Sequence, residues 1–338
     1  MLVRQIGEFG LIGRIAAMLG GQAETGVVRG IGDDVAVLDT SGPQYLLATC
    51  DIQIEGVHFT RRAMTPYQLG RRVAAINVSD IAAMGGYPRW ALVSLAIPTN
   101  TEVSYVEELY RGMREQATLA GASIVGGNLS GMESGIAVDF TLLGAIARES
   151  LILRSTARAG DSILITGSPG ESRAGLELVR RPRLELGPGI SRKLLDRHMC
   201  PQPRLREGQL LARSGQVSAM IDVSDGVIGD LGHICESSGK GAEIDVASLP
   251  VSHELSEAAL AAGAEWREWV LYGGEDYELL FTAGPDAVPG LKKMLMDETG
   301  TSCVQIGTIT DQAGEVWLRL ADGKRISPSA KGWDHFVK

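Results

Sequence analysis

Hydrophobic residues along the chain gather in short runs that polar segments separate. In the first half, the apolar runs that predict strands lie at residues 35–38, 45–49, 91–97, 123–125 and 136–147. Between them, apolar positions recur every three or four residues, as on one face of a helix. Strands and helices therefore alternate, which favours an α/β or α+β fold.

Local signals mark where two of these helices begin and end. A Thr-Pro pair at residues 65–66 predicts a helix start, and a Gly-Gly pair at residues 85–86 predicts its end. Thr99 and Glu102 have the spacing of a capping box before a second helix, which Gly121 ends.

The second half repeats the alternation after a boundary expected near residues 148–158. Further strands are predicted at 161–167, 217–221 and 277–282, with a helix beginning at Ser224. Residues 180–203 are rich in Arg and Pro and are expected to form a surface excursion. A chain of 338 residues can build two cores, so we expect an N-terminal domain over residues 1–150 and a C-terminal domain over residues 151–338.

Composition narrows the class of protein. The net charge is −9 and no basic tract occurs, which disfavours nonspecific nucleic-acid binding. Four widely spaced cysteines without a CxxC pair indicate a reduced, cytoplasmic protein without a disulfide framework or zinc site. No apolar run approaches the roughly 20 residues of a membrane span, and the first 19 residues read as an amphipathic helix rather than a signal peptide.

Six short segments combine carboxylates or amides with Gly or Ser. They read GIGDDVAVLD, DIQIEGVHF, NVSDIAAMGG, VGGNLSG, DVSDGVIGDL and GGEDYELLF. Such segments suit tight turns and helix starts with oxygen ligands projecting into a site. Many oxygen ligands and few His or Cys indicate Mg²⁺, which commonly accompanies phosphates.

Several acidic residues have both a structural and a metal-binding interpretation. Asp80 lies with Asn77 on a largely buried helix face, where a carboxylate needs an ion pair, a cap or a metal. Asp33 and Asp34 would face opposite ways in an extended strand, and one of them is expected to bond a local backbone amide in a turn. Asp51 is expected at the end of an apolar strand.

Two further groups of residues also have both kinds of interpretation. Asp222 and Asp225 flank a strand-to-helix junction, where Ser224 or Asp225 could cap the helix or the carboxylates could hold a cation beside phosphate. His58 alone is more often a packed or hydrogen-bonded residue. The chain has no Walker motif, no GxGxxG after a strand, no protein-kinase signature and no GxSxG motif.

Taken together and in this order, the segments resemble those of the thiamine-monophosphate kinase family, within the aminoimidazole-ribonucleotide synthetase-like ATP-binding superfamily. The resemblance runs from GEFGLI at residues 7–12 to KGWDHF at residues 331–336. It implies a two-domain α/β (α+β) fold whose N-terminal sheet contributes to a homodimeric barrel. It also implies that ATP, bound with several Mg²⁺ ions, donates its γ-phosphoryl group to thiamine monophosphate.

The resemblance also implies roles for individual residues. The metal ligands would be Asp33, Asp34, Thr49, Asp51, Asp80, Asp222 and Asp225, of which Asp51, Asp80 and Asp222 are central to catalysis. The residues that contact ATP would be Gly126, Gly127, Asn128, Arg154 and Ser224. The residues near the thiamine group would be His58, Glu275 and Trp333.

Two departures from the family pattern keep alternatives open. Asn128 stands where the family commonly has Asp, and Cys50 precedes Asp51 where the family has Thr. An amide brings no charge to a metal, and a thiol is a poor Mg²⁺ ligand. The chain could therefore be a catalytically weakened nucleotide-binding or regulatory homologue, or a superfamily enzyme with another substrate.

Overall fold

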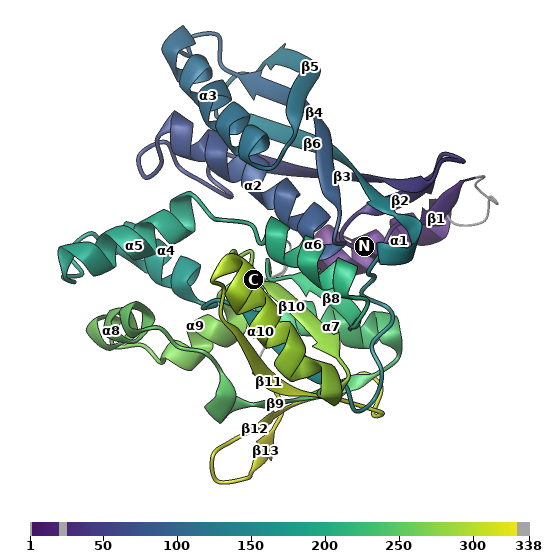
Figure 1. Ribbon diagram of the computed structural model, residues 1–338. Coiled ribbons are helices and arrows are strands. Elements are labelled where there is room, and N and C mark those ends of the chain that lie inside the picture. The colour runs from purple at the N-terminus through teal and green to yellow at the C-terminus, as the bar shows by residue number, and fades with distance from the viewer. Residues whose placement is uncertain (1, 20–25, 330–338) are drawn as a thin grey trace.

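The computed structural model describes residues 2–19 and 26–329, which form two α/β halves (Figure 1). The N-terminal half holds a six-stranded sheet in the order β1-β2-β3-β6-β4-β5. Its strands are β1 (Val27–Arg29), β2 (Ala36–Asp39), β3 (Gln44–Ile54), β4 (Tyr87–Ile97), β5 (Ser123–Gly131) and β6 (Ala137–Ala147). All neighbouring strands are antiparallel except the parallel pair β4 and β5.

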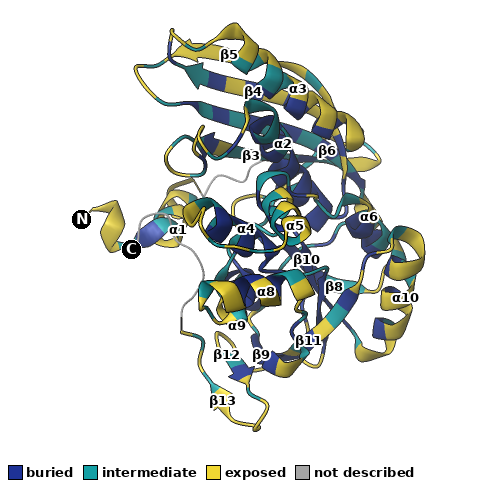
Figure 2. Cartoon of the chain, turned by 90° about the vertical axis from the view of Figure 1, so that its left-hand side faces the viewer, coloured by how far each residue is buried: buried dark blue, intermediate teal, exposed yellow. Residues whose placement is uncertain are grey.

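Two helices cover one face of this sheet, α2 (Pro66–Ala83) and α3 (Val103–Leu119), as Figure 1 shows. They pack closely because glycines lie at their contact. A Cβ on Gly70 would lie 2.1 Å from the carbonyl oxygen of Leu109, and one on Gly112 would lie 2.1 Å from that of Tyr67. The C-terminal half also contacts α2, which Figure 2 shows as buried along most of its length.

The predicted start and end of α2 are confirmed. Thr65 Oγ1 accepts a hydrogen bond from the Gln68 amide, and the Gln68 side chain accepts one from the Thr65 amide, forming a capping box. Gly85 follows the helix with φ of 75°. The predicted capping box at Thr99 is wrong, because α3 begins at Val103 and Glu102 occupies the N-cap without a side-chain cap bond.

The C-terminal half holds a seven-stranded sheet in the order β13-β12-β9-β11-β7-β10-β8. Its strands are β7 (Ser162–Thr166), β8 (Val217–Asp222), β9 (Gly241–Asp245), β10 (Leu279–Ala283), β11 (Cys303–Thr310), β12 (Val316–Arg319) and β13 (Arg325–Ile326). Alternate residues of the central strands point into two cores. Ile163 and Leu280 pack in one core, and Leu164 and Phe281 pack in the other.

The helices of this half are α4 (Glu171–Arg180), α5 (Pro188–Met199), α6 (Leu205–Ser214), α7 (Val227–Ser238), α8 (His253–Ala262), α9 (Trp266–Tyr272) and α10 (Val288–Thr299). One further helix, α1 (Gly7–Leu19), precedes the first sheet, as predicted. Its Phe9 ring lies 4.7 Å from the His233 ring of α7, so α1 contacts the C-terminal half.

Three sequence-based expectations about these elements are wrong. Strand β3 does not end before Asp51 but continues to Ile54. The helix after β8 begins at Val227 with Gly226 at its N-cap, so neither Ser224 nor Asp225 caps it. Residues 180–203 are not simply a surface excursion, because α5 packs on α4 and buries Leu194.

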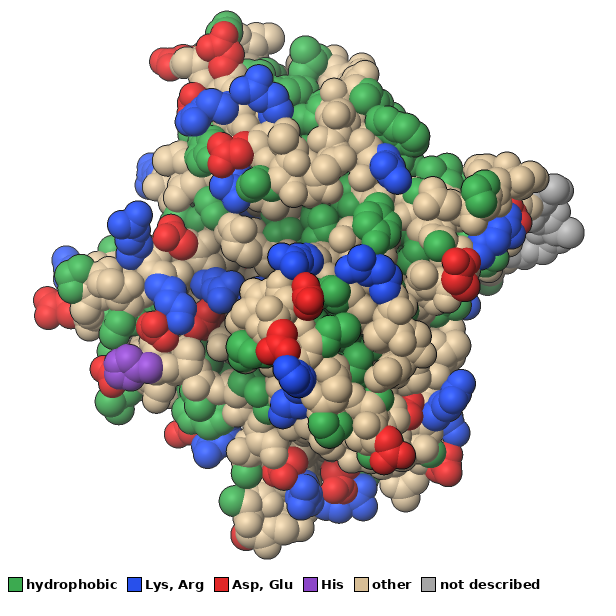
Figure 3. Space-filling view, viewed as in Figure 1, with side chains coloured by type: hydrophobic (Ala, Val, Ile, Leu, Met, Phe, Trp, Pro, Cys, Tyr) green, Lys and Arg blue, Asp and Glu red, His purple; other side chains and the backbone are tan. Residues whose placement is uncertain are grey.

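The other face of the N-terminal sheet is not covered by any helix of the described chain. Ile52, Trp90 and Leu92 lie on this open face and are 47%, 51% and 42% exposed. Space-filling atoms show apolar patches over the upper, N-terminal half (Figure 3). Within the part of the chain that the structure describes, every helix falls short of the length and apolar character that a membrane span requires.

Candidate active site

Strand β3 and helix α2 hold two of the predicted catalytic carboxylates beside each other. The hydroxyl of Thr49 donates a 2.6 Å hydrogen bond to Asp80 Oδ2. The backbone amide of Asp51 donates a 3.1 Å hydrogen bond to Asn77 Oδ1. Thr49 and Asp51 thus point from β3 toward α2, where Asn77 and Asp80 meet them.

A third carboxylate comes from the C-terminal half. Asp222 ends β8, is 3% exposed and accepts a 2.5 Å hydrogen bond from the hydroxyl of Ser79 on α2. Ser79 and Asp80 are consecutive residues, so a single turn of α2 contacts carboxylate-bearing segments of both halves. The site is therefore assembled where α2 meets both sheets.

Asp33 and Asp34 lie together in the bend before β2, where both contact Arg154. The Arg154 side chain donates to Asp34 Oδ1, and its Nε lies 3.4 Å from Asp33 Oδ1. The two carboxylates would face opposite ways only in an extended strand, and the segment is not extended there. Asp33 Oδ1 also accepts from the Asp34 amide at 3.1 Å, so the turn interpretation is confirmed for one of the two.

The turn after β8 is shaped by a carboxylate that sequence reasoning missed. Asp230 Oδ2 accepts hydrogen bonds of 3.1 Å from the amides of both Ser224 and Asp225. Asp230 is 1% exposed. It lies on the first turn of α7, and its role depends on the chain folding back over five and six residues. This contact fixes the segment that carries Asp225.

Burial and mutual repulsion raise the pKa values of these carboxyl groups. Burial is the main cause in each case, and the pKa rises to about 8 for Asp34, about 7 for Asp225 and about 6 for Asp51. The charge of Asp222 contributes to all three, whereas Arg154 lowers the pKa of Asp34. Arg154, together with Arg29 beside Asp33, does not compensate so many negative charges, so the site favours an added cation.

The donor set fits Mg²⁺. Asp34 Oδ2 is buried and has no hydrogen-bond partner, so one ligand oxygen is free. No three His, Cys, Asp or Glu side chains among the described residues converge as a ready-made metal cage. Mg²⁺ usually keeps water and takes one or two carboxylates together with substrate phosphates, so dispersed carboxylates suit it.

The predicted glycine turn lies elsewhere on the sheet. Gly126, Gly127 and Asn128 belong to edge strand β5, three strand spacings or about 14 Å from β3. A Cβ on Gly127 would lie 1.9 Å from the carbonyl oxygen of Val93, so packing against β4 already requires a glycine at this position. The pairing register places Asn128 on the open face, so it does not join the carboxylates within one chain.

The three residues predicted near the acceptor have different surroundings. His58 Nδ1 accepts a 3.0 Å hydrogen bond from the Ile54 amide and so helps to form the turn after β3. Glu275 accepts a hydrogen bond from Arg72 of α2, a buried cation that sequence reasoning missed. Trp333 lies outside the described residues.

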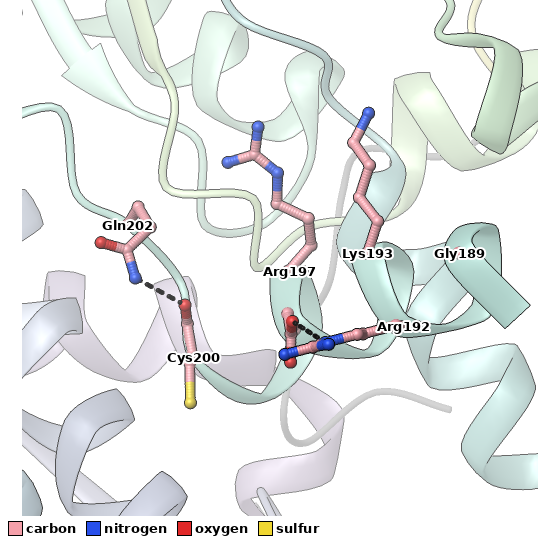
Figure 4. A pocket seen from close by; sticks show the side chains of 7 residues that line it. Gly189, Arg192, Lys193, Arg197, Cys200 and Gln202 are labelled. Atoms are coloured by element: carbon pink, nitrogen blue, oxygen red, sulfur yellow. Dashed lines mark hydrogen bonds and ion pairs between the residues drawn. The ribbon is translucent and has the colours of Figure 1, made fainter.

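A separate cavity of about 600 Å³ lies against α5 (Figure 4). It is lined by Gly189, Arg192, Lys193, Asp196, Arg197, Cys200 and Gln202. None of these was predicted as a site residue. All three of its cations are paired, since Lys193 contacts Glu171 and Glu254, Arg197 contacts Glu171, and Arg192 lies 3.9 Å from Asp196.

Comparison with known proteins agrees with this arrangement. The family models for AIR synthase related proteins match residues 32–146 with the N-terminal domain and residues 158–318 with the C-terminal domain. A thiamine-monophosphate kinase of Aquifex aeolicus is 36% identical over 336 residues, covering 99% of this chain and 100% of that protein. The chain belongs to the thiamine-monophosphate kinase family.

Other members of the thiamine-monophosphate kinase family support this assignment. The Escherichia coli K12 enzyme is 34% identical over 333 residues and 98% of each chain. The solved structure "AaThiL complexed with AMPPCP and TMP" has a TM-score of 0.85, with 36% identity and 99% of each chain covered. The resemblance and the two-domain α/β fold class expected from the sequence are thereby confirmed.

Proposed function

We propose that this protein transfers the γ-phosphoryl group of ATP to the phosphate of thiamine monophosphate, giving thiamine diphosphate and ADP. The observation that carries the proposal is the carboxylate site that α2 joins from both halves of the chain. Support comes from the relatives named thiamine-monophosphate kinase and from the related structure complexed with AMPPCP and TMP.

The residues that would hold Mg²⁺ are Asp33, Asp34, Thr49, Asp51, Asp80, Asp222 and Asp225. When bound, Mg²⁺ supplies positive charge that offsets the repulsion between the phosphates of donor and acceptor. The protein contributes by holding the carboxylates in place, with Asp51, Asp80 and Asp222 at the centre. No strong general base is required, because the attacking phosphate oxygen is already ionised at neutral pH.

Nucleotide contacts are proposed for Arg154, Ser224 and the Gly126-Gly127-Asn128 turn. Arg154 has a side chain 14% exposed and contacts both Asp33 and Asp34. A phosphate beside this cation would share it with the two carboxylates. Since Asn128 lies on the open face, its contact with nucleotide would be made across an interface between two copies of the chain.

The open face supports a homodimer as the functional form. Ile52, Trp90 and Leu92 expose apolar surface on strands whose other face contributes residues such as Leu47 and Val93 to a core. Exposed apolar patches of this kind commonly mark protein interfaces. A second copy offers the same apolar face, and a twofold interface joins like surfaces. We assign the protein to the cytoplasm on the basis of its free cysteines.

The alternative of a weakened, regulatory homologue has less support. Cys50 alternates with Asp51 along β3 and so lies on the open face, away from α2. The hydroxyl that bonds Asp80 is that of Thr49, which is retained. Replacing Thr by Cys at position 50 therefore removes no ligand from the carboxylate site.

His58, Glu275 and Trp333 are proposed to lie near the thiamine group. An aromatic face can stack on the cationic thiazolium ring, a contact worth roughly 0.5–2 kcal/mol. Trp333→Ala should raise KM for thiamine monophosphate by about a few-fold to 30-fold, while KM for ATP stays constant and Trp333→Phe retains most of the affinity. Equal changes in both KM values would indicate that Trp333 has a structural role instead of a contact with thiamine.

Product analysis tests the proposed function. Purified protein is incubated with ATP, Mg²⁺ and thiamine monophosphate, and the thiamine phosphates and ADP are separated by chromatography. The expected result is one thiamine diphosphate formed for each ADP, with no turnover after chelation of Mg²⁺. ATP consumption only with a different phosphoryl acceptor would overturn the substrate assignment, and nucleotide binding without turnover would favour the regulatory alternative.

A further inference from the structure

Arg72 is a fully buried cation in the middle of α2. Its side chain is 0% exposed, and its guanidinium donates to the carbonyl oxygen of His198 and to the carboxylate of Glu275. Its Nε lies 3.4 Å from Gln53 Oε1 on β3. A buried ion pair seldom stabilises a fold more than apolar residues of similar size would. This favours a role in holding a particular geometry.

The segment that carries Glu275 is strained and tightly held. Glu275 and Tyr277 have φ values of 58° and 52°, which L-residues rarely adopt. Their amides donate hydrogen bonds of 2.7 Å to the Ser224 carbonyl and 2.9 Å to the Val223 carbonyl. The backbone of Glu275 is therefore fixed against the segment that bears Asp222 and Asp225.

The two carboxylate oxygens of Glu275 are not equivalent. One accepts from Arg72, whereas Oε2 lies 3.7 Å from His198 Nδ1, beyond hydrogen-bond distance. Burial lowers the pKa of His198 to about 4, so its ring is neutral at neutral pH, and its Nδ1 lies 3.2 Å from Ser172 Oγ. The side chain of Glu275 is 32% exposed, so a ligand can reach this carboxylate although Arg72 is buried.

We infer that Arg72 is a positioning residue for the phosphoryl acceptor. It holds one oxygen of Glu275 so that the other faces the acceptor beside the carboxylate site. The matching ligand group is a cationic or N–H-bearing heteroaromatic ring, as in thiamine monophosphate, so the inference rests on the proposed function. ATP, whose phosphates belong to the carboxylate site, gains nothing from this pair.

The consequence is a selective loss of acceptor binding when Arg72 is changed. Without the guanidinium, the Glu275 side chain loses its only charged hydrogen-bond partner among the described residues and can rotate away. A hydrogen bond to a charged group corresponds to a change in affinity of about tenfold to a hundredfold. KM for the acceptor should rise by that factor, while KM for ATP changes less than about twofold.

Four variants and a matched control test the inference. Arg72→Met removes the cation, Arg72→Lys keeps the charge with fewer donors, and Glu275→Gln removes the anion. The double variant Arg72→Met/Glu275→Gln leaves no unpaired buried charge, so it keeps the test decisive if Arg72→Met fails to fold. Arg71→Met is the control, because Arg71 adjoins Arg72 but contacts Glu115 and Gln116 of α3.

Steady-state KM for both substrates and the melting temperature are measured for each protein. The inference is supported if acceptor KM rises selectively in both Arg72 variants and in the double variant. Of the two Arg72 variants, Arg72→Met should show the larger rise, and Arg71→Met should show none. An unchanged acceptor KM in folded Arg72→Met or in the double variant, or equal increases for both substrates, would overturn it and leave the proposed function standing. Failure of the wild-type protein to phosphorylate thiamine monophosphate would overturn both.

Discussion

The two faces of the N-terminal sheet differ sharply, although the same strands build both. On β3, Thr49 and Asp51 point toward α2, where they meet Asp80 and Asn77. The residues between them, Cys50 and Ile52, lie on the open face. One face is covered and carries the carboxylates of the candidate site, whereas the other is exposed and carries apolar side chains together with Asp139.

The difference shows that one strand can contribute to two separate surfaces, because successive side chains point to opposite faces of the sheet. Alternate residues enter opposite environments, so substitutions one position apart should have unrelated effects. On the covered face, a change should alter catalysis and metal binding. On the open face, a change should alter association of the chains.

The largest expected effect is on the covered face. Asp80→Asn should lower kcat by more than about a hundredfold. Mutating a residue that only supports a metal ligand already lowers metal affinity or activity by about 10- to 100-fold, and Asp80 is proposed as a ligand itself. Without Mg²⁺ the same variant should melt at a higher temperature than the wild type, because burial and neighbouring Asp51 raise the pKa of Asp80. Steady-state kinetics and thermal unfolding without Mg²⁺ measure the two effects.

Asp311→Asn is the matched control, since the Asp311 side chain is 78% exposed and pairs only with Lys240 among the described residues. Its kcat and melting temperature should stay close to those of the wild type. Near-normal turnover by Asp80→Asn at saturating Mg²⁺ would contradict the assignment of the covered face to catalysis.

On the open face, Leu92→Glu should separate the two copies of the chain. It places a charge in the middle of the apolar surface, where burial against a partner would be costly. Sedimentation at micromolar concentration should show a dimer for the wild type and a monomer for the variant. Val103→Glu is the control, because Val103 is 73% exposed at the start of α3. A monomeric wild-type protein would remove the basis for the open-face interface.

The stability of the metal-free protein should fall as pH rises. The pKa values of Asp51, Asp225 and Asp34 are raised from 3.8 to about 6, 7 and 8, so the folded chain retains protons that the unfolded chain releases. Their contribution is present below about pH 4 and is lost as pH rises toward 8. Urea unfolding at pH 5 and pH 8 should show this fall, and Mg²⁺ at pH 8 should reverse it. Equal stability at both pH values would contradict the raised pKa values of these carboxyl groups.

The smallest expected effect concerns the ends of the two covering helices. Thr65→Ala removes an observed capping box from α2 and should lower the free energy of unfolding by about 1 kcal/mol. Thr99→Ala should change it by no more than about 0.5 kcal/mol, because Thr99 does not cap α3. Chemical denaturation of both variants measures the difference, and equal losses would show that Thr99 has a capping role.

Sequence reasoning succeeded where local chemistry decides the structure. The Thr-Pro pair before α2 and the Gly-Gly pair after it act within a few residues, so both ends of the helix were predictable. It failed for the end of β3, because Asp51 and Gln53 continue the strand at positions that α2 covers. A polar residue on a covered face looks like a strand end when the covering helix is unknown.

The candidate site was predictable only in part for the same reason. The acidic segments were visible, but the partners of their carboxylates come from distant parts of the chain. Ser79 and Asp222 are 143 positions apart, and Arg72 and Glu275 are 203 positions apart. Arg72 and Ser79 are polar residues within a largely buried helix, which indicates that each has a partner. Nothing in a single sequence identifies which residues they contact.

The most direct test of the shared site is binding of the ATP analogue AMPPCP, measured by calorimetry with and without Mg²⁺. Wild type is compared with Asp51→Asn from β3 and Asp222→Asn from β8, one variant from each half of the chain. If both halves hold the same Mg²⁺-nucleotide complex, Mg²⁺ should increase the affinity of the wild type for AMPPCP. In each variant this Mg²⁺-dependent increase in affinity should be smaller by more than about tenfold. Loss in only one variant, or wild-type binding that does not depend on Mg²⁺, would contradict the shared site.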